Sequence, residues 1–282
     1  MAVLAVVVGL FVTAVGYVYA VDRDPTTPGP AVDHDRHAAE QHGLSDSRDG
    51  YVLTPLALPA ERGDAGVVAF RIVGPDGSSV TGYEHVLTEP LHLYVVREDL
   101  SFYQHLHPTL AGDTWTAAVR VPDGGVYRLY AEFMPTGRAD NGHPVVLGVP
   151  FVIAGDTRYD PLPEPVPMVD VGGLRVRRFD GVATAAARRP DVLRFQVLDV
   201  HGVPVGTLQP YLGTYAHVSA FDAATGSITH LHPTMPASRT GPPGDGVLTF
   251  QTEFPQRGRY RLFLQFKAAD VVHQAAFTVT VA

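Results

Sequence analysis

The motif His-Leu-His-Pro-Thr occurs twice in this chain, at 105–109 and at 230–234, and a further histidine stands thirteen residues before the start of each copy. A shift of 125 residues superimposes the two motifs and also places His92 on His217 without a gap. Isolated glycine and apolar positions around the motifs align under the same shift. A segment that recurs in register predicts two tandem units of one fold, each with a core of its own.

Short apolar runs separated by turn residues indicate that both units are built from β-strands. The 282 residues include 28 glycines and 24 prolines, which interrupt the apolar runs before they reach the length of a helix. Several short strands per unit are typical of antiparallel sandwiches. We therefore expect an all-β chain of two tandem antiparallel β-sandwiches, immunoglobulin-like or cupredoxin-like, after one N-terminal transmembrane helix.

The N-terminal segment predicts a membrane anchor. Residues 1–21 carry no charged side chain and are long enough to cross a bilayer. A cleaved signal peptide is the alternative, because Val18 and Ala20 are acceptable to signal peptidase. The segment that follows is acidic, which predicts a cytoplasmic N-terminus and an extracytoplasmic bulk. We expect a single-pass protein of the cell membrane, or a secreted protein if the segment is cleaved.

Composition also divides the chain into segments. A polar stretch rich in proline and aspartate is expected to be a disordered stalk, and a proline-rich stretch to be the linker between the sandwiches. The predicted order is anchor or signal segment 1–21, stalk 22–50, first β-sandwich 51–155, linker 156–169 and second β-sandwich 170–282.

Charge and cysteine content exclude several classes of function. The formal net charge is −8 and there is no basic cluster, which argues against nucleic acid as a partner. The absence of cysteine removes disulfides, thiolate metal sites and cysteine-based catalysis. Any metal ion must therefore be held by histidine, methionine, carboxylate or backbone groups.

The repeated histidines have the spacing of a metal site on a β-hairpin. His105 and His107 are two residues apart on an expected strand, so both side chains leave the same face. The pairing sum of a hairpin is the sum of the residue numbers of two directly opposed residues. If it is 197 or 199, His92 lies opposite His105 or His107, with about 5 Å between the β-carbons. Three imidazoles can then converge on one ion, and the second hairpin repeats the arrangement with His217, His230 and His232. The other face of each hairpin is apolar and should be core, which leaves the histidines in an open patch on the outer side or at the rim of the sandwich.

Further ligands follow each hairpin in the sequence. His143 and His273 lie after comparable strands of the two units and are candidate fourth ligands, and Met235 is a candidate soft ligand. Imidazoles suit Cu(II), Zn(II) and Ni(II), and copper binds such sites most tightly. A methionine would favour Cu(I). We expect copper, as Cu(II) or Cu(I), with zinc as the second candidate.

The segments LHLYVVREDLSFYQHLHPT and YAHVSAFDAATGSITHLHPT, at 91–109 and 215–234, resemble the His-bearing hairpins of a bacterial family of secreted or membrane-tethered heavy-metal-binding proteins. The resemblance implies tandem β-sandwiches outside the membrane and a role in metal handling. The chain is more distantly similar to periplasmic copper-resistance β-sandwiches. Those proteins use a mature N-terminal histidine that has no counterpart here, so their site is not carried over.

Three functions follow as alternatives. The first is an extracytoplasmic metal-binding protein that buffers, senses or delivers copper, with a membrane metal transporter as its partner. The second is a tandem adhesion or assembly module in which the histidines are structural. The third is a cupin-like metalloenzyme, although the carboxylates that follow the motifs, Asp113 and Asp245, are not at cupin spacing. We expect no enzyme and no catalytic residue.

Overall fold

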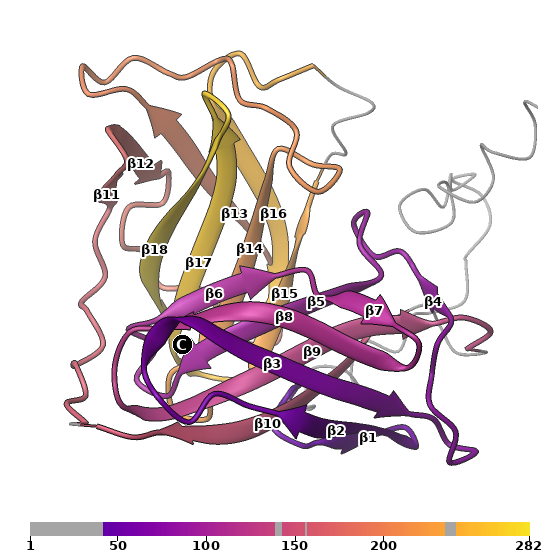
Figure 1. The fold of residues 1–282 in the computed structure, drawn as a ribbon. Coiled ribbons are helices and arrows are strands. Elements are labelled where there is room, and N and C mark those ends of the chain that lie inside the picture. Colours follow the sequence, from indigo (N-terminus) through magenta and orange to yellow (C-terminus); the bar gives the residue numbers. More distant parts are fainter. Residues whose placement is uncertain (1–41, 139–142, 156, 235–240) are drawn as a thin grey trace, which may run out of the picture.

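The computed structural model describes residues 42–138, 143–155, 157–234 and 241–282, and every regular element in them is a β-strand (Figure 1). The expected all-β fold of two tandem antiparallel units is confirmed. No helix within the described residues is long and apolar enough to cross a membrane. The predicted anchor at 1–21 lies outside the described residues.

The first unit is a sandwich of two sheets. One sheet has the order β1-β2-β3-β8-β7 and the other the order β10-β9-β5-β6, with β4 paired to β9. The strands are β1 (Ser47–Arg48), β2 (Tyr51–Ala57), β3 (Gly63–Val73), β4 (Tyr83–Glu84), β5 (Leu91–Arg97), β6 (Tyr103–Leu106), β7 (Thr109–Ala111), β8 (Thr114–Val121), β9 (Gly125–Pro135) and β10 (Val145–Ile153).

The second unit repeats this plan as one continuous eight-stranded sheet that curls around its core, in the order β11-β12-β13-β16-β15-β14-β17-β18. The strands are β11 (Met168–Val171), β12 (Leu174–Arg178), β13 (Pro190–Leu198), β14 (Ala216–Asp222), β15 (Ile228–Pro233), β16 (Val247–Glu253), β17 (Gly258–Ala268) and β18 (Val271–Val281).

The repeated motif marks the place where the chain crosses between the two layers of each unit. In the first unit, β6 pairs with β5 of one sheet, and β7 begins at Thr109 and pairs with β8 of the other sheet. In the second unit, one strand makes both contacts: β15 pairs with β14 up to Leu231 and with β16 from His232 onward. Proline suits this corner because it donates no ladder hydrogen bond. The motif is therefore an architectural feature as well as a candidate site.

The predicted inner face of the first hairpin is confirmed. Leu91, Leu93 and Val95 are fully buried in the core of the first unit, where Trp115 and Phe133 also pack. Alternation along β5 sends His92 and Tyr94 to the other face. That face is also buried, because every residue of β5 is buried.

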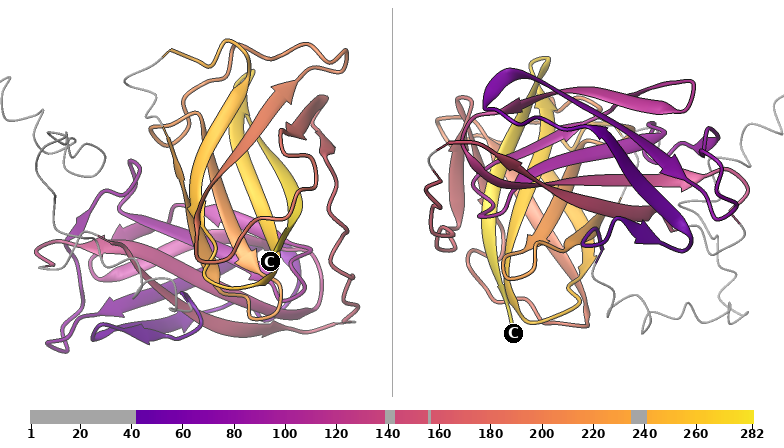
Figure 2. Two further views of the ribbon diagram at one scale, coloured as in Figure 1. Left: turned by 180° about the vertical axis from the view of Figure 1, so that it is seen from behind. Right: turned by 60° about the horizontal axis from the view of Figure 1, so that its bottom comes forward.

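The second unit covers this other face, so the predicted open patch of histidines is wrong. The strands of the second unit run steeply across those of the first unit in all the views of the ribbon (Figures 1 and 2). The rings of Tyr103 and Phe263 stack with 4.3 Å between their centroids, and the Tyr103 hydroxyl lies 3.0 Å from Ser219 Oγ. Aromatic and aliphatic residues on the outer face of each hairpin supply a third apolar cluster. The outer face of each hairpin is not exposed, because it carries large apolar side chains beside the histidines and these pack against the other unit.

The segment before β2 is anchored to both units. The amide of Gly148 on β10 donates to Ser45 O (2.7 Å), and the amide of Ile228 on β15 donates to His42 O (3.1 Å). Residues 47–48 form β1. The described end of the predicted stalk is thus held by backbone hydrogen bonds. Regular structure begins before residue 50, where the stalk is predicted to end and the first sandwich to follow. The rest of the stalk lies outside the described residues.

Candidate metal centre

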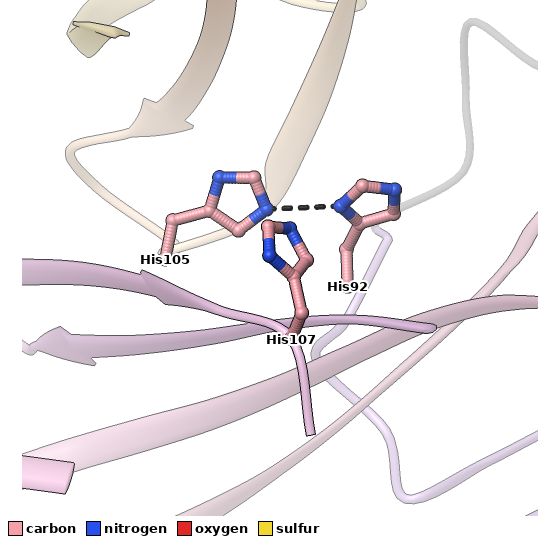
Figure 3. Close-up of side chains that lie close together, drawn as sticks. All are labelled: His92, His105 and His107. Carbon is pink, nitrogen blue, oxygen red and sulfur yellow. Dashed lines mark hydrogen bonds between the residues drawn. The ribbon is translucent and has the colours of Figure 1, made fainter. Parts of the chain in front are cut away.

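The first hairpin has the register that brings its three histidines together. Leu93 pairs with Leu106 and Tyr94 with His105, which is the pairing sum of 199. The same register places His92 across from His107 at the open end of the hairpin. One ring nitrogen from each of His92, His105 and His107 lies within 4.8 Å of the other two (Figure 3). This group can hold a metal ion.

The backbone fixes the orientation of the His92 ring. His92 Nε2 lies 2.7 Å from the carbonyl oxygen of Val86, which can only accept. Nε2 therefore carries the proton in the neutral ring, and Nδ1 presents a lone pair. That lone pair points at His105 Nε2, 3.0 Å away.

A glutamine of the second unit fixes the orientation of the His105 ring. His105 Nδ1 lies 2.8 Å from Gln265 Oε1. The amide nitrogen of Gln265 donates to Gln274 Oε1 (3.2 Å), while the amide oxygen faces His105. His105 Nδ1 is therefore the donor, and Nε2 presents a lone pair to His92. Two lone pairs thus face each other at 3.0 Å, an arrangement that needs a proton or a metal cation between them.

His107 supplies a third nitrogen to the same point. Its Nε2 is buried and has no hydrogen-bond partner among the described residues. The ring centroid of His107 lies 5.1 Å from that of His92 and 4.8 Å from that of His105. His107 also lines an open pocket of about 430 Å³ beside β3 and β8, so the cluster is not sealed from solvent. A buried polar atom without a partner costs free energy, and a bound ion would remove that cost.

Burial keeps the imidazoles of His105 and His107 neutral at physiological pH. Desolvation, then the charges of His92 and His107, lower the pKa of His105 well below its usual value, and the hydrogen bond that His105 donates to Gln265 opposes this effect. Desolvation, with a smaller effect of His92, lowers the pKa of His107 to about 4. Metal ligation requires unprotonated imidazole, so these rings are ready to bind without releasing protons at pH 7.

Sequence reasoning missed two polar residues that stand beside the cluster. Glu132 on β9 is directly opposite His92, is 1% exposed, and accepts a hydrogen bond from the Tyr94 hydroxyl (2.8 Å). Gln265 on β17 is directly opposite His217 in the same way. The only signal was the alternation of polar residues along otherwise apolar strands, because neither residue belongs to the repeated motif.

The second hairpin repeats the backbone support of the first. His217 Nε2 lies 2.8 Å from Tyr211 O, which is the carbonyl equivalent to that of Val86. The turns that hold these carbonyls both contain a leucine with φ of 51°, at Leu87 and Leu212. Non-glycine residues rarely adopt this conformation, so its repetition indicates that the carbonyl position matters. The side chains of His230 and His232 lie outside what the structure describes, although their backbone belongs to β15.

His143 and His273, the candidate fourth ligands of the first and second hairpins, do not belong to the described group of three histidines. His143 is exposed in the segment before β10. His273 stacks on Phe266, with 5.3 Å between the ring centroids, on the core side of β17 and β18 and thus on the opposite face from Gln265. Met235 lies outside the described residues. A role for any of these three as a ligand remains a prediction.

Fold and site together define a tandem β-sandwich protein with a buried histidine triad between its two units. The chain belongs to the family described as Domain of unknown function (DUF8832), whose model matches residues 46–146 and 170–282. No curated protein matches the chain. The family description assigns no activity, so the resemblance to heavy-metal-binding and copper-resistance proteins remains a prediction.

Several solved structures show distant likeness. The E. coli adhesin FdeC is 15% identical, with 84% of this chain and 65% of that chain covered and a TM-score of 0.26. Domains 4 and 5 of the S-layer protein SbsC are 11% identical, with 84% and 99% covered and a TM-score of 0.24. The filamin domain of Lin-41 is 15% identical, with 38% and 91% covered and a TM-score of 0.27. At these scores the likenesses say nothing about function.

Proposed function

We propose that this protein binds one transition-metal ion between His92 Nδ1, His105 Nε2 and His107 Nε2. The observation that supports the proposal is the lone-pair arrangement: two acceptor nitrogens face each other at 3.0 Å, beside a third buried nitrogen with no described partner. Hydrogen bonds to Val86 and Gln265 hold the first two rings in this orientation. Such outer contacts are what fix metal-binding histidines in known sites.

Copper is the ion that this donor set favours. Three neutral imidazoles bind Cu(II) more tightly than Ni(II) or Zn(II). The pocket beside His107 leaves room for water or another small ligand to complete the coordination. We propose copper as the physiological ion and zinc as the second candidate.

The role we propose is extracytoplasmic metal buffering or delivery. A buried site of three imidazoles suits storage or transfer of an ion. The hydrophobic segment 1–21 would hold the protein at the membrane, close to a metal transporter. Location and partner both remain proposals.

The test is an equilibrium titration of the metal-free full chain with Zn(II), Cu(II) and Cu(I). We expect the His105→Gln and His107→Gln variants each to lose one equivalent of uptake relative to the parent. The control is His201→Gln, which changes an exposed histidine on a turn and should leave uptake unchanged. Equal uptake by the parent and both triad variants would overturn the proposal.

An adhesion or assembly module with structural histidines is the second candidate. It is favoured by the hydrogen bonds of His92 and His105 to groups of the protein and by their burial between the units. In that case the same variants would lose stability by about 1–3 kcal/mol, the cost of unpaired buried groups, while the parent would bind no metal.

A further inference from the structure

We infer that the second unit is part of the metal centre, with Gln265 as the positioning residue that holds His105 ready to bind the ion. The inference rests on the proposed function and adds a form of regulation to it: ion binding is linked to the docking of the two units. Figure 3 shows His105 at the side of the cluster that faces the second unit.

Gln265 reaches His105 from a rigid part of the second unit. It lies in the middle of β17, between β14 and β18, and is 7% exposed. Its neighbours along the strand, Leu264 and Phe266, are fully buried in the core of that unit. The position of Oε1 is therefore set by the packing of the second unit and by the hydrogen bond to Gln274.

The contact decides which nitrogen of His105 holds the proton. With Gln265 Oε1 at 2.8 Å, the proton resides on Nδ1 and the lone pair of Nε2 faces the cluster. Without that acceptor, the favoured arrangement moves the proton to Nε2, where it can donate to His92 Nδ1 at 3.0 Å. A proton there would occupy the place that the ion needs. Gln265 thus removes the arrangement that competes with metal binding.

The residue directly opposite the first histidine of each hairpin differs between the two units. Glu132 stands opposite His92 in the first unit, and Gln265 stands opposite His217 in the second. The carboxylate of Glu132 accepts a hydrogen bond from Tyr94 of its own unit, whereas the amide of Gln265 accepts one from the partner unit. The two units therefore have different roles: the first supplies the histidines and the second orients one of them.

Linkage makes the effect reciprocal. If docking of the second unit raises the affinity for the ion by some factor, the bound ion must favour docking by the same factor. An ion bound at the triad therefore strengthens the interface between the units, and separation of the units releases the ion.

The test compares the affinity of the full chain for Zn(II) and Cu(II) with that of two variants at one position. Gln265→Met preserves the length of the side chain and removes the acceptor, and we expect affinity to fall about 10–100-fold, as for other outer contacts of metal ligands. Gln265→Glu restores an acceptor and should restore parental affinity or exceed it. Gln274→Ala changes an exposed residue that orients the Gln265 amide, and should give a smaller loss in the same direction.

The matched control is Ser219→Ala. It removes the hydrogen bond between Ser219 and Tyr103, which also joins the units but does not touch the triad. We expect its metal affinity to match that of the parent. Equal affinity of the parent and Gln265→Met, or an equal loss in Ser219→Ala, would overturn the positioning role. If the parent itself takes up no metal, the proposed function fails before this inference is reached.

Discussion

At the scale of the residue, the most informative atoms are three ring nitrogens. His92 and His105 each use one nitrogen to donate outward, to Val86 O and Gln265 Oε1, which leaves the other facing the cluster. His107 Nε2 has no described partner. His92 Nδ1 and His105 Nε2 face each other at 3.0 Å, beside the third ring nitrogen.

His217 gives a pH-dependence to the stability of the apo protein. Burial, opposed by the hydrogen bond to Tyr211, lowers the pKa of His217 to about 4, against about 6.5 in an unfolded chain. The unfolded state binds more protons between these values, so stability is complete above about pH 6.5 and falls as pH drops towards 4. The loss from this residue is at most about 3 kcal/mol.

Urea unfolding of the metal-free chain at pH 7 and pH 4.5 measures this effect. We expect His217→Gln to be less sensitive to pH than the parent. The same slope with pH in both proteins would show that His217 does not supply the dependence.

At the scale of the element, the segment before β1, which contains Gly43 and Ser45, packs directly against strand β10. A β-carbon on Gly148 would lie 2.0 Å from the carbonyl oxygen of Gly43, so the two backbones are in direct contact. The adjacent hydrogen bond from Gly148 N to Ser45 O holds the same segment. Because that segment also bonds to β15 through His42, it joins the two units.

Gly148→Ala should therefore displace the segment and destabilise the protein by about 1–3 kcal/mol, the usual cost of overpacking. Thermal unfolding, together with protease cleavage near residue 45, measures both effects. Gly112→Ala is the control for a glycine whose added β-carbon would meet nothing within 4 Å, although its φ of 62° adds local strain. Unchanged stability and unchanged cleavage of Gly148→Ala would show that the close contact is not required.

The strands of the first hairpin could be predicted from the sequence, whereas the surroundings of the site could not. The expected hairpin of His92, His105 and His107 is formed by β5 and β6, and its pairing sum of 199 is one of the two expected values. Gln265 and Glu132 belong to strands remote from the motif, and only the packing of sheets brings them to the histidines. The burial of the triad was missed because one strand face was assumed to be solvated, while β5 is buried on both.

At the scale of the whole molecule, the two units pack through equivalent faces of their hairpin sheets. His92 and His217, and Tyr94 and Ser219, occupy equivalent positions, as the shift of 125 residues requires. The apolar part of this interface includes Tyr103 of the first unit and Phe263 of the second. The histidine triad contacts the second unit through His105 and Gln265, so an ion bound at the triad should stabilise the interface as well.

Phe263→Ala tests the cooperativity of the two units. Removal of a buried phenylalanine typically costs about 3–5 kcal/mol, and here part of that cost falls on the interface. We expect calorimetry of the metal-free chain to show one transition in the parent and two separated transitions in the variant. Saturating Zn(II) should bring the transitions of the variant closer together. A variant that unfolds in a single transition would contradict an energetic role for this interface.

The most direct test of the metal centre is anomalous diffraction from crystals of the full chain loaded with copper or zinc. The account predicts one peak at roughly 2.0–2.1 Å from His92 Nδ1, His105 Nε2 and His107 Nε2, the usual length of such metal–nitrogen bonds. It also predicts that Gln265 Oε1 stays within hydrogen-bonding distance of His105 Nδ1. An empty triad in crystals that bind the ion elsewhere would contradict the account.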